Sequence, residues 1–296
     1  MTLNTERTAE RYQDLDSWSL GGSLAALTEA NLRALRAVEA ALPALTRAAE
    51  ALSVRLERGG RLVYVGAGTS GRIAVQDAAE LVPTFGFRRT EVLIAGGSGA
   101  EAHAVEGAED DQDAARRAVD NLALGDHDAL IGIAASGRTP YTVAAIAHAG
   151  HSGVLTVGIA NNPSTPLLGA AEIAVLLDTG PEVLAGSTRL AAGTAQKAAL
   201  NALSTSVLVG LGGAYQNLMV GMTPTNDKLR DRAVQIVCQA TGTDPGAATQ
   251  TLTRSDYDIR AAIVMLKTGL PLADAQHRLE HHNQRVRAVL AEFGLD

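Results

Sequence analysis

Cysteine, aromatic residues and long apolar runs are all scarce in this chain of 296 residues. The single cysteine, Cys238, excludes a disulfide framework and any metal site built from several cysteines. No uninterrupted apolar stretch reaches the roughly 20 residues that a membrane-spanning helix needs. Aromatic residues make up only 3% of the chain, whereas small side chains abound. This composition favours closely packed helices and sheets over an all-β sandwich.

Positive charge is also in deficit, because 25 basic residues stand against 32 acidic ones and the net charge is −7. This balance argues against a nucleic-acid-binding protein, which would carry a basic face. A hydrophobic content of 46% is enough for a buried core and excludes disorder as the main state. Residues 1–19 are polar and acidic, unlike a signal peptide. We therefore expect a cytoplasmic protein that contacts neither nucleic acid nor membrane.

Short apolar runs separated by helical stretches dominate the middle of the chain. Five of them are expected to form strands buried on both faces, at residues 61–66, 91–96, 128–135, 154–160 and 173–178. The segments between the first three are long enough for crossover helices. This alternation predicts an α/β fold, a doubly wound five-stranded parallel sheet with helices on both faces.

Helical patterns flank these strands on both sides. Apolar residues recur at mostly three- or four-residue intervals from Leu24 to Leu56, which predicts helix interrupted near Pro43 and stopped by Gly59. Helix is also expected after residue 186 and again from residue 226. Beyond a linker at 241–245, three more helices are expected, the last over residues 271–290. The predicted parts are an N-terminal helical segment packing on the core (1–58), a sheet domain (59–230) and a small C-terminal helical module (243–296).

The first predicted strand ends in a glycine-rich loop, residues 66–71, that formally matches the dinucleotide fingerprint GxGxxG. Two features oppose a nucleotide site: residues 96–99 replace the acidic residue expected after the second strand, and no lysine follows the glycines. The hydroxyl groups of Thr69 and Ser70, next to Gly71, instead suit a phosphate monoester.

A second loop of the same chemistry follows the third predicted strand. Ser136 and Thr139 offer hydroxyl groups, Gly137 lets the backbone approach a ligand, and a helix N-terminus follows. Either loop alone could be an ordinary turn with a helix-capping residue. Together, after two parallel strands, they predict a site for a small phosphorylated molecule.

Carboxylates stand out in the helical stretches after the first two strands. Glu80 closes the first stretch, and Glu109 lies in an acidic cluster at residues 106–111, expected on a helix. A buried glutamate with a raised pKa can transfer protons, although a solvated acidic face is the alternative. Glu182 and Ser187, before the next long helix, are candidates for contacts to substrate hydroxyl or amide groups, with helix capping as the alternative for Ser187. No credible set of metal ligands is present.

In this order, the motifs resemble those of the N-acetylmuramic acid 6-phosphate etherases, members of the sugar isomerase domain superfamily. The matching segments run from about residue 61 to 229 and read RLVYVGAGTSGR, DAAELVPTFG, IAGG, AVEGAEDD, GIAASGRTPY, GPEVLAGSTRLAAGTAQKAALNALST, NLMV and TNDKL. The resemblance implies that residues 59–230 form a phosphosugar-binding sugar isomerase domain. The spacing of the C-terminal helices resembles a ubiquitin-associated-like fold.

The resemblance also implies roles for individual residues. Glu80 and Glu109 match the family's two active-site glutamates, and Ser187 matches a substrate contact. Ser70, Ser136 and Thr139 match its phosphate-loop hydroxyls. The implied enzyme is a carbon–oxygen lyase that needs no cofactor or metal and acts as a homodimer, with its active site near the subunit interface. Its implied substrate is a phosphosugar met in cell-wall amino-sugar recycling or catabolism.

Three other functions stay open at this point. An aldose–ketose phosphosugar isomerase of the same superfamily would share both loops and one base. A regulator that responds to phosphosugars without turnover, similar to the glucokinase regulatory protein, would need only the binding loops. A nicotinamide-dependent dehydrogenase rests on the GxGxxG match alone.

Overall fold

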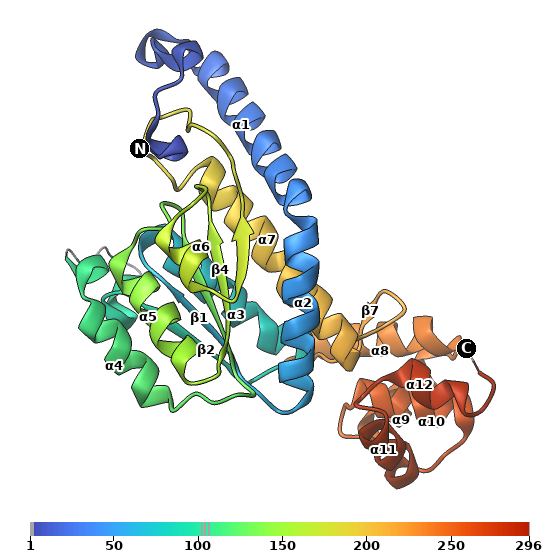
Figure 1. Cartoon of the computed structure of the whole chain (residues 1–296). Helices are drawn as coiled ribbons and strands as arrows, with labels where there is room; N and C mark the ends of the chain where they lie inside the picture. Colours follow the sequence, from blue (N-terminus) through green and yellow to red (C-terminus); the bar gives the residue numbers. More distant parts are fainter. Residues whose placement is uncertain (1–2, 102, 104, 106, 296) are drawn as a thin grey trace. The chain divides into compact units, whose positions relative to one another are not determined.

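Five parallel strands form one sheet in the order β2-β1-β3-β4-β5 (Figure 1). The strands are β1 (Leu62–Gly66), β2 (Thr90–Ile94), β3 (Ala129–Ala134), β4 (Leu155–Ala160) and β5 (Ile173–Leu176). The five predicted strands are thus confirmed, each within two residues at either end. Every residue of β1, β3 and β4 is buried, whereas the edge strands β2 and β5 are only partly buried. The expectation of burial on both faces is right for the three central strands only, because each edge strand has a neighbour on one side.

The computed structural model describes residues 3–101, 103, 105 and 107–295. Contacts divide the chain into two compact units, residues 1–78 with 89–204 and residues 79–88 with 205–296. The sheet lies in the first unit. The division crosses α3 (Gly68–Phe85) and falls near the end of α7 (Ala191–Leu208). The two units are defined by contacts between residues and do not test the three parts predicted from the sequence. Those three parts therefore remain a prediction.

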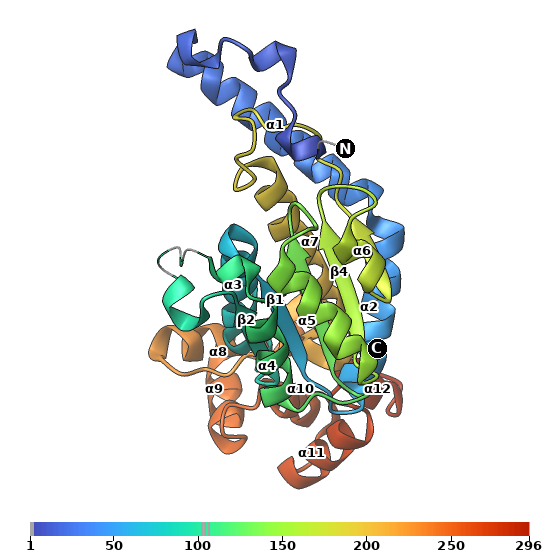
Figure 2. The ribbon, with the colours of Figure 1, turned by 60° about the vertical axis from the view of Figure 1, so that its left-hand side comes forward.

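Helices cover both faces of the sheet, as Figures 1 and 2 show. On one face, α4 (Gln112–Leu122), α5 (Pro140–His151) and α6 (Pro166–Ala170) share a buried apolar cluster with the central strands. On the other, α2 (Leu42–Glu57) packs against β4 and β5. There α3 is tied to β1, because the Tyr64 hydroxyl donates to Asp77 at 2.8 Å. The doubly wound arrangement is confirmed.

The N-terminal region consists of three short 3-10 turns followed by two long helices. The turns are η1 (Asn4–Glu6), η2 (Glu10–Tyr12) and η3 (Leu15–Ser17), and α1 (Leu20–Ala40) precedes α2. Pro43 lies in the first turn of α2, so the predicted interruption is confirmed. In α1 the buried face consists mainly of alanines, whereas Leu24 and Leu35 face solvent. No helix in the described ranges has both the length and the apolar content that crossing a bilayer requires.

The second unit has its own apolar core, to which all five helices from α8 to α12 contribute. Its elements after α7 are the π-helical turn η6 (Val209–Gly213), β6 (Ala214–Tyr215), β7 (Leu218–Met219), α8 (Asp227–Thr241), α9 (Pro245–Arg254), α10 (Ile259–Thr268), α11 (Leu272–His281) and α12 (Val286–Ala291). The single helix predicted over residues 271–290 is wrong. It is broken into α11 and α12, because Asn283 and Gln284 adopt positive φ angles of 50° and 64°.

An ion pair at the amino ends of β1 and β3 supports the sheet. The Asp128 carboxylate accepts from the Arg61 backbone N–H at 2.7 Å, from its guanidinium at 2.7 Å and from the Gly125 N–H at 3.0 Å. Burial alone would raise the pKa of the Asp128 carboxyl, but the hydrogen bonds from Arg61 and Gly125 outweigh it and hold the pKa below its ordinary value.

We expect Asp128→Asn to lower the free energy of unfolding by about 1–3 kcal/mol at pH 7, since it breaks a partly buried pair. Because the pKa of Asp128 is lower in the folded protein than in the unfolded chain, its ionised carboxylate stabilises the fold above the unfolded-state pKa of about 4. This stabilisation is lost as pH falls through the pKa of the folded state. The difference between wild type and variant should therefore narrow below about pH 4. Denaturant unfolding between pH 3 and 7 measures this difference in the free energy of unfolding. Asp113→Asn, in an exposed pair with Arg116, is the control and should change stability by less than about 0.5 kcal/mol.

Candidate functional site

The first glycine-rich loop leaves β1 and turns at once into α3. A Cβ atom on Gly71 would lie 2.7 Å from the Ile94 side chain, so glycine is required there by close packing. Ser70 is buried, and its hydroxyl donates to Gln196 Oε1 at 2.9 Å. The loop therefore presents the N-terminal turn of an 18-residue helix at the carboxyl end of a buried strand, an arrangement that favours anions.

The second loop leaves β3 and turns into α5. Gly137 has a φ of +63°, and a Cβ there would lie 2.2 Å from Thr165 Oγ1. Both facts require glycine. Ser136 Oγ accepts from the Arg138 backbone N–H at 3.1 Å, which leaves its hydroxyl hydrogen available. Thr139 occupies the capping position of α5, but its side chain makes no capping hydrogen bond. The Thr139 hydroxyl is therefore not used in capping this helix.

Strand order brings the two loops together. Gly66 of β1 pairs with Ile133 of β3, so both loops begin at the same edge of the sheet. The chain passes from β1 to β2 on one side and then returns to β3 on the other. Such a reversal of strand order marks the usual ligand-binding place of an open α/β sheet.

Glu109 lies beside the first loop. A Cβ atom built on Gly68, the first residue of α3, would be 3.2 Å from Glu109 Oε1. Glu109 is exposed and belongs to the short turn η5 (Ala108–Asp110), whereas α4 begins only at Gln112 with Asp111 as its cap. Glu109 thus lies on a helix, as expected, but on the short 3-10 helix η5, because the capping residue Asp111 starts the longer helix α4 only after it. Glu106 lies outside the described residues.

Glu80 lies on α3 at an exposed position, three residues after the buried Asp77. The boundary between the two units falls between Ala78 and Ala79, so Glu80 belongs to the second unit and Glu109 to the first. The two predicted catalytic carboxylates thus come from different units, and their pairing stays a prediction.

Glu182 is 1% exposed and holds the start of α7. Its two carboxylate oxygens accept from the Ala191 and Ala192 backbone N–H groups, each at 2.9 Å. Burial raises the pKa of the Glu182 carboxyl, although the two backbone hydrogen bonds and the charge of Arg33 act against this. Glu182 therefore has a structural task that the sequence did not indicate. Ser187 is half-buried in the same loop, where its backbone N–H donates to Leu184 O at 3.0 Å.

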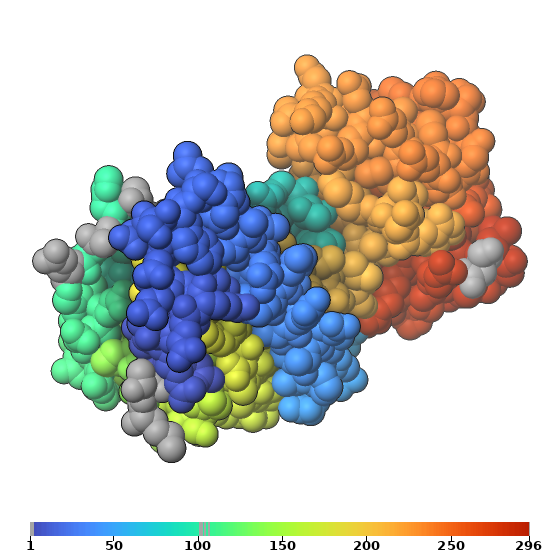
Figure 3. All heavy atoms as spheres, turned by 90° about the horizontal axis from the view of Figure 1, so that it is seen from above, coloured from blue at the N-terminus to red at the C-terminus, as the bar shows by residue number. Residues whose placement is uncertain are grey.

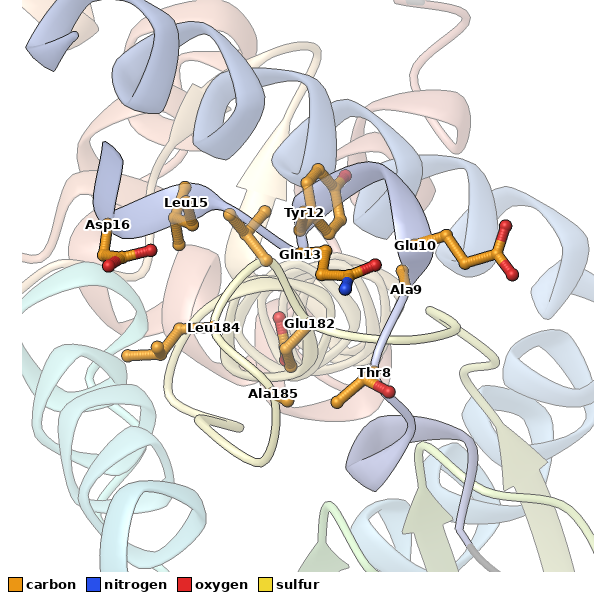
Figure 4. A pocket seen from close by; sticks show the side chains of 11 residues that line it. Thr8, Ala9, Glu10, Tyr12, Gln13, Leu15, Asp16, Glu182, Leu184 and Ala185 are labelled. Atoms are coloured by element: carbon orange, nitrogen blue, oxygen red, sulfur yellow. The ribbon is translucent and has the colours of Figure 1, made fainter. Parts of the chain in front are cut away.

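A cavity of about 670 Å³ lies next to Glu182, between residues 8–16 of the N-terminal segment and residues 182–185 (Figure 4). The figure shows Glu182 at the end of α7, which is viewed along its axis. The N-terminal segment is fixed there by Thr5, which is fully buried and bonds to the side chain of Asn162. Sequence reasoning missed this wall, because its residues lie far from the loops along the chain.

Two buried amides behind the first loop were also missed. Gln196 of α7 accepts from Ser70 and donates to Asn161 Oδ1 at 2.9 Å. Asn161 directly follows β4, as Ser70 and Ser136 follow their strands, and this position at a strand end was the signal that could have found it. Among the residues that the structure describes, no group of three or more histidine, cysteine or acidic side chains could hold a metal ion.

Family profiles and known proteins match this chain along most of its length. The profile of the glucokinase regulatory protein N-terminal SIS domain covers residues 44–150, and that of the SIS domain covers residues 111–206. A solved structure, described as a putative phosphosugar isomerase involved in capsule formation from Bacteroides fragilis, has a TM-score of 0.50 and 21% identity. It covers 66% of this chain and 94% of that chain. This likeness shows the fold alone.

Two curated relatives carry the same name, N-acetylmuramic acid 6-phosphate etherase. The protein from Deinococcus radiodurans is 52% identical over 290 residues, which is 97% of this chain and 95% of the relative. The protein from Salmonella agona is 45% identical over 291 residues, 98% of each chain. At such identity over nearly the full length of both proteins, this chain belongs to the N-acetylmuramic acid 6-phosphate etherase family.

Proposed function

We infer that this chain is a carbon–oxygen lyase that cleaves the D-lactyl ether of N-acetylmuramic acid 6-phosphate. With one water molecule it would give N-acetylglucosamine 6-phosphate and D-lactate. The observation that carries this inference is the 52% identity to an etherase along nearly the whole chain. The two hydroxyl-bearing loops, side by side where the strand order reverses, with Glu109 against the first, support a phosphosugar as substrate.

The ether itself explains why two acid–base groups are needed. An unactivated alkoxide leaves poorly, and water alone does not displace it. When the sugar ring opens, the C1 aldehyde makes the C2 proton acidic, and the ether oxygen on C3 is β to that carbonyl. Removal of the C2 proton then allows elimination.

We assign the two proton transfers to the two glutamates. Glu109 first takes the C2 proton to leave an enolate. The C3–O bond then breaks, and Glu80 gives its proton to the departing lactate oxygen. Water then adds to C3 of the conjugated aldehyde, returning a proton to Glu80, while C2 regains one from Glu109. Each positioned group contributes about 10²–10⁴ in rate. The steps exchange no electrons with another molecule, so the proposal includes no redox cofactor.

Binding at the far end of the sugar would hold C2 and C3 within reach of these carboxylates. We propose that Ser70 and Gly71 of the first loop and Ser136, Gly137 and Thr139 of the second bind the phosphosugar. We further propose that Glu182 and Ser187 contact its hydroxyl or amide groups. Glu182 would do so through lone pairs that the start of α7 leaves unused.

We also propose that the protein acts as a homodimer in the cytoplasm, in cell-wall amino-sugar recycling or catabolism, with the active site near the subunit interface. The outward face of α1 supports a partner surface, because Leu24 is 65% and Leu35 is 49% exposed. Their spacing of 11 residues is close to three helical turns, so both lie on one face. Figure 3 shows the N-terminal residues, in dark blue, with nothing over them on the viewed side.

Incubation of the purified protein with N-acetylmuramic acid 6-phosphate should release D-lactate and N-acetylglucosamine 6-phosphate in equal amounts. An enzymatic lactate assay with product identification by mass spectrometry measures this. Formation of a ketose phosphate without lactate would instead indicate an isomerase. Binding without turnover would indicate a phosphosugar-responsive regulator, and reduction of a nicotinamide would indicate a dehydrogenase.

Replacing each glutamate should block a different step. We expect Glu80→Gln to lower lactate release by at least about 10²-fold, to leave phosphosugar binding largely intact, and still to exchange the C2 hydrogen of the substrate in D₂O. Glu109→Gln should lose both lactate release and this exchange, because the C2 base is missing. NMR of the recovered substrate measures the exchange, and calorimetry measures binding.

Two exposed carboxylates are matched controls for this pair, Glu50→Gln on α2 and Asp110→Asn beside Glu109, and both should behave as wild type. Loss of binding with Glu80→Gln on the scale of the lost activity would mean that Glu80 is structural. C2 exchange by Glu109→Gln but not by Glu80→Gln would reverse the two roles.

Charged residues in place of the exposed leucines of α1 should separate the subunits. We expect Leu24→Glu combined with Leu35→Glu to convert a dimer to monomers at micromolar concentration, since a buried carboxylate without a partner is strongly unfavourable. Sedimentation velocity measures the change. Leu295→Glu, an exposed leucine near the C-terminus, is the control and should leave the dimer intact. A dimer that persists in the double variant places the interface elsewhere.

A further inference from the structure

A cavity of about 400 Å³ lies within the second unit. It is lined by residues 220–224 before α8, by Arg230 of α8, by the turn at residues 256–258 and by the first turn of α10, which carries Arg260. Every one of these residues belongs to the second unit. The proposed reaction uses none of them, so the two arginines of this cavity call for an explanation of their own.

Arg260 is a partly buried cation with most of its hydrogen-bond donors unused. Its Nε donates to the backbone oxygen of Gly212 at 2.9 Å, which engages one of the five N–H groups of a guanidinium. Within the part of the chain that the structure describes, its two terminal nitrogens form neither a hydrogen bond nor an ion pair. A Cβ atom on Gly221 would lie 2.7 Å from Arg260 Nη2, so the guanidinium lies close to the backbone of the cavity wall. Four N–H groups are therefore available to an occupant of the cavity.

The surroundings of Arg260 do not offset the burial of its charge. Burial lowers the pKa of the Arg260 guanidinium, and the negative charge of Asp258 only partly opposes this. Asp258 is already engaged, because its side chain caps α10 by accepting from the Ala261 backbone N–H at 3.1 Å. A charge withdrawn from water is stabilised by hydrogen bonds and by a partner of opposite sign. An anion in the cavity would provide both.

Arg230 brings a second guanidinium to the same cavity. Its guanidinium carbon lies over the ring of Tyr257, 5.4 Å from the ring centroid. Its ion pair with Asp227, at 3.5 Å, is exposed on both sides and therefore holds it weakly. Because stacking on a ring leaves the N–H edge of a guanidinium free, Arg230 can contact an anion without losing the ring.

The turn between α9 and α10 is strained, and it lines this cavity. Asp256 and Tyr257 adopt φ angles of 50° and 60°, in the left-handed region that side chains other than glycine rarely occupy. The Tyr257 N–H donates to Leu252 O at 2.7 Å, which holds the turn in place. Strain of this kind often occurs at binding sites. Here it starts the ten-residue helix α10 at the cavity, where the N–H groups of its first turn add to the preference for an anion.

We propose that this cavity binds a small oxyanion, a carboxylate or a phosphoryl group, through the terminal nitrogens of Arg260, with Arg230 as the second cation. A guanidinium presents two parallel N–H donors, and these match two oxygens of either group. The volume exceeds that of an inorganic ion, and Val220 and Met222 give the cavity apolar walls. The ligand therefore carries an organic body behind its anionic end. The inference does not depend on the proposed lyase activity.

Amide NMR spectra of the whole chain, titrated separately with inorganic phosphate and with D-lactate, test the proposal because they report binding residue by residue. Occupation of the cavity should shift the amide signals of residues 220–224 and 256–260. Shifts with phosphate alone would identify a phosphoryl site, and shifts with D-lactate alone a carboxylate site, and either result supports the proposal. Arg260→Gln should weaken the binding at least about tenfold, because charge-assisted hydrogen bonds are lost. Arg260→Lys keeps the charge without the paired donors and should weaken it about three- to tenfold.

Further variants separate binding from a structural role of Arg260. Arg230→Gln leaves the bond from Arg260 to Gly212 in place and should still weaken the anion about threefold, as expected for one exposed charge. Asp256→Asn removes an exposed negative charge from the cavity lining and should strengthen binding about twofold. Arg254→Gln, an exposed arginine of α9 outside the lining, is the matched control and should change nothing. If thermal unfolding shows Arg260→Gln to be unstable, the Arg230→Gln and Asp256→Asn results decide.

Three results would overturn the proposal. The first is a wild-type spectrum in which neither probe shifts residues 220–224 or 256–260. The second is binding that Arg260→Gln and Arg230→Gln leave unchanged, because the two arginines would then serve the fold alone. The third is an equal loss with the control Arg254→Gln, which would reduce the effect to net charge. Failure to release lactate while these spectra behave as stated would instead overturn the proposed function alone.

Discussion

The pairing of β1 with β3 is the constraint on which the candidate site depends. Because Gly66 lies opposite Ile133, the loops that carry Ser70 and Ser136 leave the sheet at the same edge. The helices that follow these loops cover opposite faces of the sheet, α3 on one and α5 on the other. Two helix N-termini therefore begin side by side, and their free N–H groups together favour an anion more than either would alone.

Buried amides give this edge its chemical polarity. Apolar residues behind Ser70 would hold the loop by packing but would leave its hydroxyl free to turn. Gln196 and Asn161 remove that freedom, and they cost little because each bond in their chain is satisfied. Helix α7 combines small buried side chains with a buried polar one, because Gln196 lies between buried alanines.

Sequence reasoning succeeded where structure is decided locally. Apolar runs and glycines located the strands and both loops, because burial and tight turns leave a pattern in neighbouring residues. It failed where distant segments meet. The partner of Ser70 lies 126 positions away, the wall of the cavity comes from residues 8–16, and the cap of α7 is Glu182 rather than an adjacent hydroxyl. The leucines of α1 obeyed the helical period, but periodicity alone could not tell that Leu24 and Leu35 face outward.

The amino edge of the sheet carries an ion pair, and the carboxyl edge carries both loops. At the amino edge, Arg61 and Asp128 pair closely and satisfy the backbone around them. Among the described residues, buried hydroxyl groups without a hydrogen-bond partner lie on Thr90, at the amino end of β2, and on Thr142, Thr165 and Thr179, which follow β3, β4 and β5. Unpaired buried groups destabilise a fold and are unusual in native proteins. Three of the four follow the carboxyl ends of strands, the side of the sheet that carries both loops, and the fourth lies at the amino edge.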